Sequence, residues 1–326
     1  MQDILALASA NLLTPMILCF ALGLFAALAR SELTIPEAVA KGMSIYLLFA
    51  IGFKGGVAVA DHGLDARLVA ALLAGVALSF LLPFAAFALL RVMTRLSPTD
   101  AAAVAAHYGS ISIVTFVTAS SVLQSVGLVA EGYMVAVAAA MEAPAIISAL
   151  HLASRSGGRA EAMDADLWRE ILLNGSIVLL VGSFLIGLVT GEPGMARIEA
   201  FIVAPFQGVL CLFLLDMGLV AGRGMRGARA VLTAEVLAFG LVMPVVGAGF
   251  GLAAGLTLGL SPGGVALMMV LAGSASYIAV PAAMRVALPE ANPSVYLTLS
   301  LGVTFPFNLV LGIPAWVAVA TAVGGS

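Results

Sequence analysis

The chain has 326 residues, of which 62% are hydrophobic and only 10% are charged, and its mean hydropathy is +1.16. Soluble globular proteins carry roughly 25% charged residues, so the composition excludes that class and indicates a protein that crosses a membrane several times. The net charge of −3 at pH 7 provides no basic surface of the kind that binds nucleic acid.

Ten apolar runs follow one another along the chain. A run of about 18 residues or more is long enough to cross the hydrocarbon core as a helix. The sequence therefore predicts an all-α polytopic membrane protein with ten transmembrane helices, at 12–29, 35–59, 67–93, 99–125, 129–153, 171–190, 197–222, 229–256, 262–288 and 293–322.

One polar stretch longer than a turn, 154–170, divides these spans into five and five. The predicted domains are a first repeat at 1–153, a short cytoplasmic linker at 154–170 and a second repeat at 171–326. An odd number of spans in each half gives the two halves opposite orientations, which is the inverted-repeat architecture of many secondary transporters.

Basic residues predict the orientation of the spans. When the loops are assigned alternately to two sides, ten Arg fall on one side and only Arg67 and Arg197 fall on the other. The side rich in Arg is predicted to be cytoplasmic. Ten spans then place both termini outside.

A short pattern in the fourth span recurs in the ninth. Gly109-Ser110-Ile111-Ser112 is matched by Gly273-Ser274-Ala275-Ser276, and Leu96-Ser97-Pro98 is matched at the same offset by Leu260-Ser261-Pro262. The two halves are therefore predicted to be duplicates. A Gly-Ser step at mid-membrane depth can break a helix, because Gly adds no side chain and a Ser hydroxyl can satisfy the freed backbone groups.

Two facing breaks would form a binding site near the pseudo-twofold axis. Half-helix N-termini attract anions, whereas hydroxyl and carbonyl oxygens suit a small hard cation. The alternative is that the small residues only let helices approach closely. The substrate-binding candidates are Gly109, Ser110, Ser112, Gly273, Ser274 and Ser276, and Thr115 supplies a further hydroxyl.

Ionisable groups at membrane depth are costly, so they are functional candidates. His107, just before the first break, is a candidate for proton handling or anion orientation, or else a hydrogen-bonded packing residue. Glu142, next to the helix breaker Pro144, is a candidate for balancing the charge of a cation, with a structural pair as the alternative. Lys54 and Asp216 either form an ion pair between spans two and seven, or Lys54 extends toward the membrane surface.

The sequence contains no enzyme or metal motif. It lacks a phosphate loop, its three His lie in separate segments, and Cys19 and Cys211 both fall inside apolar runs. The chain is therefore predicted to be a transporter and not an enzyme, with no resident cofactor and no metal site.

The chain resembles the SbtA-type sodium-dependent bicarbonate transporter family over essentially its whole length. The motifs that carry the resemblance are Ile35-Pro36-Glu37-Ala38 running on to Gly52 and Gly55-Gly56, Gly109-Ser110, Glu142-Ala143-Pro144-Ala145, and Ala291-Asn292-Pro293-Ser294 with Tyr296. The resemblance implies a 5+5 inverted repeat in which crossed, broken fourth and ninth helices belong to a core domain. Spans one, two, six and seven would form a gate domain.

The resemblance also implies a function. It predicts a homotrimer in the bacterial inner membrane that imports bicarbonate or another small anion by symport with Na⁺, and a PII-like regulator is a further partner that the family suggests. The family's substrate site maps onto Gly109, Ser110, Gly273, Ser274 and Ser276. Glu142 matches an acidic family residue, whereas Tyr277 stands where the family has a carboxylate, so weaker Na⁺ binding is expected.

Two other kinds of function are compatible with these residues. A carrier or antiporter of the same fold could couple transport to protons through His107 and Glu142. From a different class, the chain could be an intramembrane enzyme or a membrane sensor. Saturable uptake that requires Na⁺ separates the leading prediction from both of these.

Overall fold

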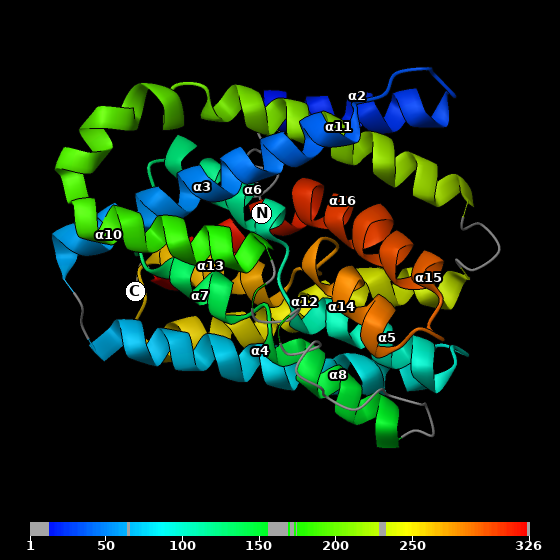
Figure 1. The fold of residues 1–326 in the computed structure, drawn as a ribbon. Coiled ribbons are helices and arrows are strands. Elements are labelled where there is room, and N and C mark those ends of the chain that lie inside the picture. Colours follow the sequence, from blue (N-terminus) through cyan, green and yellow to red (C-terminus); the bar gives the residue numbers. More distant parts are fainter. Residues whose placement is uncertain are drawn as a thin grey trace.

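The computed structural model describes residues 13–63, 66–155, 169, 173, 175–227 and 233–324 (Figure 1). Within this part of the chain all regular structure is helical, and eight helical segments are long and apolar enough to cross a membrane. Two further apolar helices, α2 (Pro15–Leu28) and α13 (Pro262–Ala272), are shorter. The prediction of an all-α multi-pass membrane protein is confirmed.

The other helices follow in chain order. The first half contains α3 (Glu37–His62), α4 (Ala66–Met93), α5 (Pro98–Gly109), α6 (Ile113–Ser125), α7 (Met134–Ala140) and α8 (Pro144–Arg155). The second half contains α10 (Gly175–Ile202), α11 (Phe206–Gly227), α12 (Ala234–Thr257), α14 (Ala279–Ala287), α15 (Pro293–Leu297), α16 (Phe305–Phe307) and α17 (Ile313–Gly324). Most of the predicted linker, 154–170, and both termini lie outside the described residues.

One predicted boundary between spans falls within α10. The sequence places the end of one span at residue 190 and the start of the next at 197, and the helical backbone of α10 (Gly175–Ile202) is interrupted at Gly191. Gly191 has φ +54°, a conformation that favours glycine, and there the chain turns sharply. Residues 192–202 then run back along α3, where the Tyr46 hydroxyl donates to the Phe201 carbonyl at 2.7 Å.

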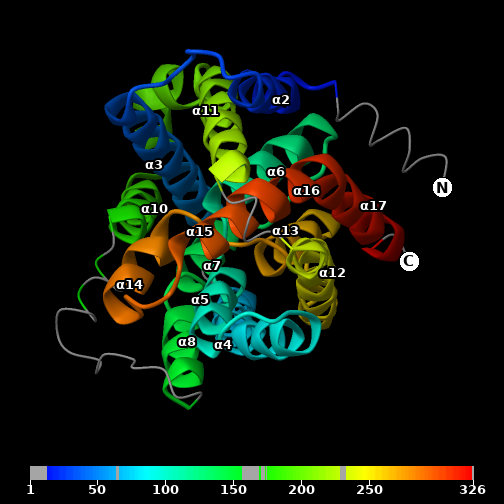
Figure 2. The same ribbon diagram turned by 90° about the vertical axis from the view of Figure 1, so that its right-hand side faces the viewer.

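The helices form two groups that lie on opposite sides of the molecule in both views (Figures 1 and 2). In the first group α10 packs along α3 and α11 packs along α2. In the second group α4 packs against α5, α12 packs against α13, and α4 and α12 contact each other. Helices α6, α7 and α13 lie between the groups, so the interrupted segments are positioned where the two groups meet.

Glycines allow the paired helices of the first group to touch backbone to backbone. A Cβ at Gly187 of α10 would clash with the Phe53 carbonyl of α3, and a Cβ at Gly23 of α2 would clash with the Leu215 carbonyl of α11. Small residues that permit such close approach are typical of helix packing in membranes, where apolar burial alone does not favour helix association.

The last span contains two π-helical stretches, η1 (Thr298–Thr304) and η2 (Asn308–Gly312). A π-helix has a wider turn than an α-helix and occurs frequently at functional sites. The second stretch places the buried Asn308 side chain against the interruption that follows α13, where its amide Nδ2 donates to the Gly273 carbonyl at 2.9 Å.

Two carboxylates fasten loops onto the starts of α5 and α13. Asp100 Oδ1 accepts from the Asn292 backbone N–H at 2.8 Å. At the other end of the molecule, Glu131 accepts from the Ser261 N–H at 2.7 Å and from the Ser261 hydroxyl at 3.1 Å. Helices α5 and α13 each begin at a Ser-Pro step of the duplicated pattern. The hydroxyl of that Ser, Ser97 or Ser261, caps the backbone N–H three residues later.

Candidate functional site at the crossed helices

Both predicted interruptions are present. Helix α5 ends at Gly109, Ser110 is extended (φ −87°, ψ 165°), and α6 begins at Ile113. In the second half, α13 ends at Ala272 and α14 begins only at Ala279. Residues 109–112 and 273–278, called the crossing below, therefore mark where the two helices are interrupted in the middle of their spans.

The two interruptions contact each other directly. The Ser112 backbone N–H donates to the Ser274 hydroxyl at 2.9 Å. The Ser276 N–H donates to the His107 carbonyl at 2.7 Å. Backbone groups freed by one break are thus satisfied by the other, as buried polar groups in a membrane require.

The two glycines are needed because other helices approach them closely. A Cβ at Gly109 would clash with the ring of Pro83 on α4 and would lie 2.8 Å from Ala145 Cβ. A Cβ at Gly273 would lie 2.7 Å from the Pro244 carbonyl of α12. Both breaks are therefore pressed against a proline-containing helix of the second group.

The crossing hydroxyls have different roles. Ser112 Oγ accepts from the Thr115 N–H at 3.2 Å and from the Thr115 hydroxyl at 2.8 Å, so it caps α6. Ser274 Oγ donates to the Leu271 carbonyl at 3.0 Å. Ser110 Oγ is buried without a hydrogen-bond partner, but Ser110 does not line the small cavity at the crossing.

Four predicted residues line one small cavity at the crossing. Ser112, Ser276, Glu142 and Tyr277 surround a volume of about 10 Å³, together with Ser176 of α10. Glu142 is 4% exposed, and neither its Oε2 nor the Tyr277 hydroxyl oxygen has a hydrogen-bond partner. Buried polar atoms rarely remain unpaired, so these atoms point to a bound ligand or ion.

The cavity has the size and chemistry of a site for a single ion. A volume of about 10–15 Å³ holds roughly one water-sized sphere. Carboxylate and hydroxyl oxygens are hard donors, which suit a small hard cation. Ile113, the first residue of α6, and Ile278, the residue just before α14, line the same cavity, so two helix N-termini begin beside it and favour negative charge there.

His107 is fully buried beside the first break. Its Nδ1 lies 2.7 Å from the Ala103 carbonyl and must donate to it, which leaves Nε2 as an acceptor without a partner. The ring stacks on Tyr296 with ring centroids 4.5 Å apart. The imidazole is therefore held in a packing position, and one nitrogen remains able to accept a proton.

Lys54 and Asp216 are not brought together. The Lys54 ammonium lies 4.5 Å from the ring centroid of Phe206, the first residue of α11. Asp216 is ten residues further along the same helix, which corresponds to about 15 Å of helix axis. No ion pair between them is found in the described part of the chain, and Asp216 is buried on α11.

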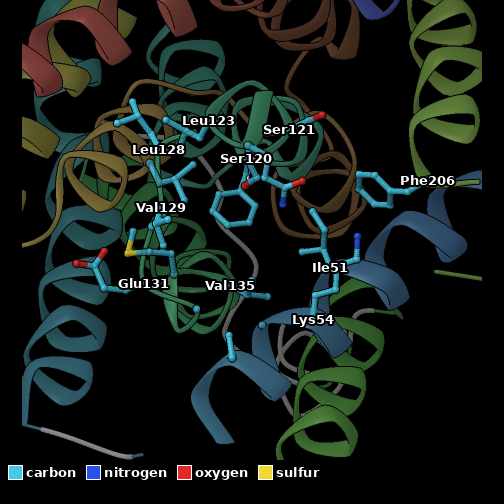
Figure 3. A pocket seen from close by; sticks show the side chains of 18 of the residues that line it. Ile51, Lys54, Ser120, Ser121, Leu123, Leu128, Val129, Glu131, Val135 and Phe206 are labelled. Carbon is cyan, nitrogen blue, oxygen red and sulfur yellow. Dashed lines mark hydrogen bonds between the residues drawn. The ribbon is translucent and has the colours of Figure 1, made fainter. Parts of the chain in front are cut away.

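A second and larger pocket lies between α3, α6, α7 and the start of α11 (Figure 3). This side pocket has a volume of about 420 Å³. Its polar lining residues include Lys54, Ser120, Gln124 and Glu131. None of the crossing residues lines it, so the two cavities are separate in this structure.

The sequence reasoning missed Asn308, the side pocket and the contribution of Ser176. An Asn in an apolar span is a detectable signal, because amides at membrane depth find partners across helices. The side pocket carries no comparable sequence signal, since it is formed by segments from both halves. Among the described residues, no group of three or more His, Cys, Asp or Glu is arranged to hold a metal ion.

Comparison with known proteins finds one family. Residues 15–321 match the family model described as the Na⁺-dependent bicarbonate transporter superfamily. The matched range begins with α2 and ends within α17, and it includes both broken helices. No curated protein matches the chain.

Proposed function

The chain belongs to the Na⁺-dependent bicarbonate transporter superfamily, and we propose that it is a secondary active symporter of bicarbonate or another small anion with Na⁺. The observation that carries this proposal is the crossing. There, two helix N-termini, the Tyr277 hydroxyl and the unpaired carboxylate oxygen of Glu142 meet at one buried cavity, and the unpaired Ser110 hydroxyl belongs to the same interruption of α5 and α6.

We propose a 5+5 inverted repeat for the architecture. Residues at the offset of the duplicated pattern have matching roles in the two halves. Ser97 and Ser261 cap the first half of each broken helix, while Gly23 and Gly187 each allow close packing with a partner helix. The first group of helices would be the gate domain, and the second group, with the crossing, would be the core domain.

Electrostatics explains why the two ions would move together. The N-termini of α6 and α14 favour an anion, but an ionised Glu142 beside them opposes it. A Na⁺ ion coordinated by Glu142 and the neighbouring hydroxyl oxygens removes this repulsion. Each ion therefore binds more tightly when the other is present, which is the reciprocity that coupled transport requires.

Movement of the core against the gate would expose the crossing to each side in turn. The surfaces where α3 and α11 meet α6 are incompletely filled. A further gap of about 10 Å³ lies there, lined by apolar residues such as Leu47, Val117 and Phe213. Apolar side chains at this gap permit sliding at lower cost than a hydrogen-bonded surface, and the hydrogen bond from the Gln207 amide of α11 to the Ser121 hydroxyl of α6 would have to break or move with it.

Proton coupling is the second candidate, and the buried atoms favour it over an intramembrane enzyme. Glu142 Oε2 and His107 Nε2 both lack partners, so each can accept a proton. An intramembrane hydrolase is less well supported. Its nucleophile would be Ser110 or Ser112, and no hydrogen bond from either to His107 is found among the described residues.

The remaining features of the proposal follow from the family resemblance and from the distribution of Arg. They are a homotrimer, a location in the bacterial inner membrane with both termini outside, and regulation by a PII-like protein. No cofactor beyond the transported ions is needed for this mechanism.

Uptake of radiolabelled bicarbonate into proteoliposomes tests the function. We expect saturable uptake that depends on an inward Na⁺ gradient at fixed pH. Replacing Na⁺ by K⁺ on both sides is the control, and it should reduce uptake to the level of empty liposomes. Uptake driven by a pH gradient alone, with or without Na⁺, would instead establish the proton-coupled carrier.

A further inference from the structure

The side pocket is a second candidate for contact with the substrate. It is bounded by α3, by α6, by residues 127–135 and by Phe206 of α11. Its volume of about 420 Å³ compares with about 10 Å³ for the cavity at the crossing. This is far more room than the crossing cavity offers, and it suits a small ion that still carries part of its hydration shell.

Two of the described lining residues carry charge, and they are not equivalent. Lys54 and Glu131 lie on opposite sides of the pocket (Figure 3). Both carboxylate oxygens of Glu131 accept hydrogen bonds from Ser261, at the N-terminus of α13. Its negative charge is therefore already compensated by hydrogen bonds and by the helix dipole.

Lys54 has no comparable partner. Its side chain is half-buried, and its ammonium lies over the face of the Phe206 ring. An aromatic face attracts a cation but leaves the N–H groups on the far side without an acceptor. In the described part of the chain no carboxylate pairs with this ammonium. The end of the pocket at Lys54 therefore carries an uncompensated positive charge.

Polar groups of α6 also line the side pocket. Ser120 and Gln124 are four residues apart, so they lie on one face of α6 and both line the pocket. The Ser120 hydroxyl donates to the Phe116 carbonyl and keeps its lone pairs, whereas the Gln124 amide supplies N–H donors. The Gln124 amide and the Lys54 ammonium are therefore the side-chain donors that these residues offer to an oxyanion.

We propose that the side pocket is a capture subsite for a small oxyanion, with Lys54 as its binding residue. This inference rests on the proposed function, because it adds a first binding position for the same substrate. Helix α6 links the two positions. Phe116 lines the pocket and lies four residues, about 6 Å along the helix axis, after Ser112 at the crossing. The wall of the side pocket at Phe116 is thus about one helical turn from the crossing.

Uptake kinetics provide the first test. Lys54→Met keeps the apolar stem and removes the charge, so the KM for bicarbonate should rise about five- to tenfold, with a much smaller change in Vmax. Lys54→Arg should restore the KM. Lys41→Met is the matched control, because Lys41 is exposed on the same helix and does not line the pocket. A KM unaffected by Lys54→Met would overturn the proposal.

A second test does not depend on transport. In a background with Cys19→Ala and Cys211→Ala, Ser120→Cys is placed in the pocket, and its rates of reaction with an anionic and a cationic methanethiosulfonate reagent are compared. The ratio of anionic to cationic rates should fall several-fold when Lys54→Met is added, and bicarbonate should slow the anionic reagent only when Lys54 is present.

The two tests separate the two proposals. If the wild-type protein moves no bicarbonate but the rate ratio depends on Lys54, the anion subsite stands and the proposed function fails. If Na⁺-dependent uptake is present but neither KM nor the rate ratio responds to Lys54, the proposed function stands. The side pocket is then not an anion subsite, and Lys54 serves only as an anchor near the membrane surface.

Discussion

Glu142 is the residue whose environment says most about coupling. It follows the end of α7, is almost completely buried, and has an oxygen without a hydrogen-bond partner beside Ser112, Ser276 and Tyr277. A buried carboxylate is strongly disfavoured in its charged form unless a cation or a proton accompanies it. In the proposed transport cycle, the cation or proton that accompanies Glu142 would be the coupling ion.

Replacing Glu142 distinguishes Na⁺ from a proton as the coupling ion. Glu142→Gln preserves the shape of the side chain and removes the charge, so the Na⁺ concentration for half-maximal uptake should rise about tenfold or more. The measurement is bicarbonate uptake against Na⁺ concentration at fixed pH. Glu37→Gln, exposed in the first turn of α3, is the control. Unchanged Na⁺ dependence together with lost pH dependence would favour proton coupling.

At the scale of helices, close packing of α10 on α3 holds the first group together as one unit. The contact runs along Gly52, Gly56 and Gly187, where a side chain on either helix would meet the backbone or a side chain of the other. Two helices packed backbone to backbone move together. In the proposed transport cycle, the first group would therefore move or stay fixed as one unit.

Alanine substitutions on α10 test this contact. Gly187→Ala should lower the thermal unfolding temperature of the purified protein, because its Cβ would clash with the Phe53 carbonyl, and overpacking of this kind costs about 1–3 kcal/mol. Gly182→Ala, on the same helix with no atom within 4 Å of the added Cβ, should leave that temperature unchanged or slightly higher. Equal effects of the two substitutions would show that the contact does not hold the helices together.

At the scale of the whole molecule, orientation decides what the side pocket faces. The pocket is lined by Glu131, whose carboxylate binds Ser261 just after the α12–α13 loop, so it lies at that end of the molecule. The distribution of Arg predicts that this end is outside. A capture subsite at that end would receive the anion before import, which agrees with the proposed direction of transport.

Labelling with a membrane-impermeant thiol reagent tests the orientation. In the cysteine-free background, Thr257→Cys, exposed at the end of α12, should react in intact cells. Ser31→Cys, exposed in the loop between α2 and α3, should react only after the cells are permeabilised. The reverse result would place the side pocket on the cytoplasmic side and make it an exit site.

The sequence by itself determined the features that depend on local chemistry. Membrane spans are recognisable because the bilayer imposes a length and an apolar composition on each run. The breaks at Gly109 and Gly273 are recognisable because a duplicated Gly-Ser step weakens a helix wherever it occurs. In both cases the cause lies within a few neighbouring residues.

Only the tertiary structure decided which side chains meet. Lys54 lies over Phe206 and not beside Asp216. The chain turns back at Gly191, which fixes where α11 begins, and the first residue of α11 is the one that meets Lys54. Glu142 joins Ser112 and Tyr277, and Asn308 reaches Gly273, through contacts between residues far apart in the chain. Such contacts depend on how helices from both halves pack around one another, and no local pattern of apolar and polar residues encodes that packing.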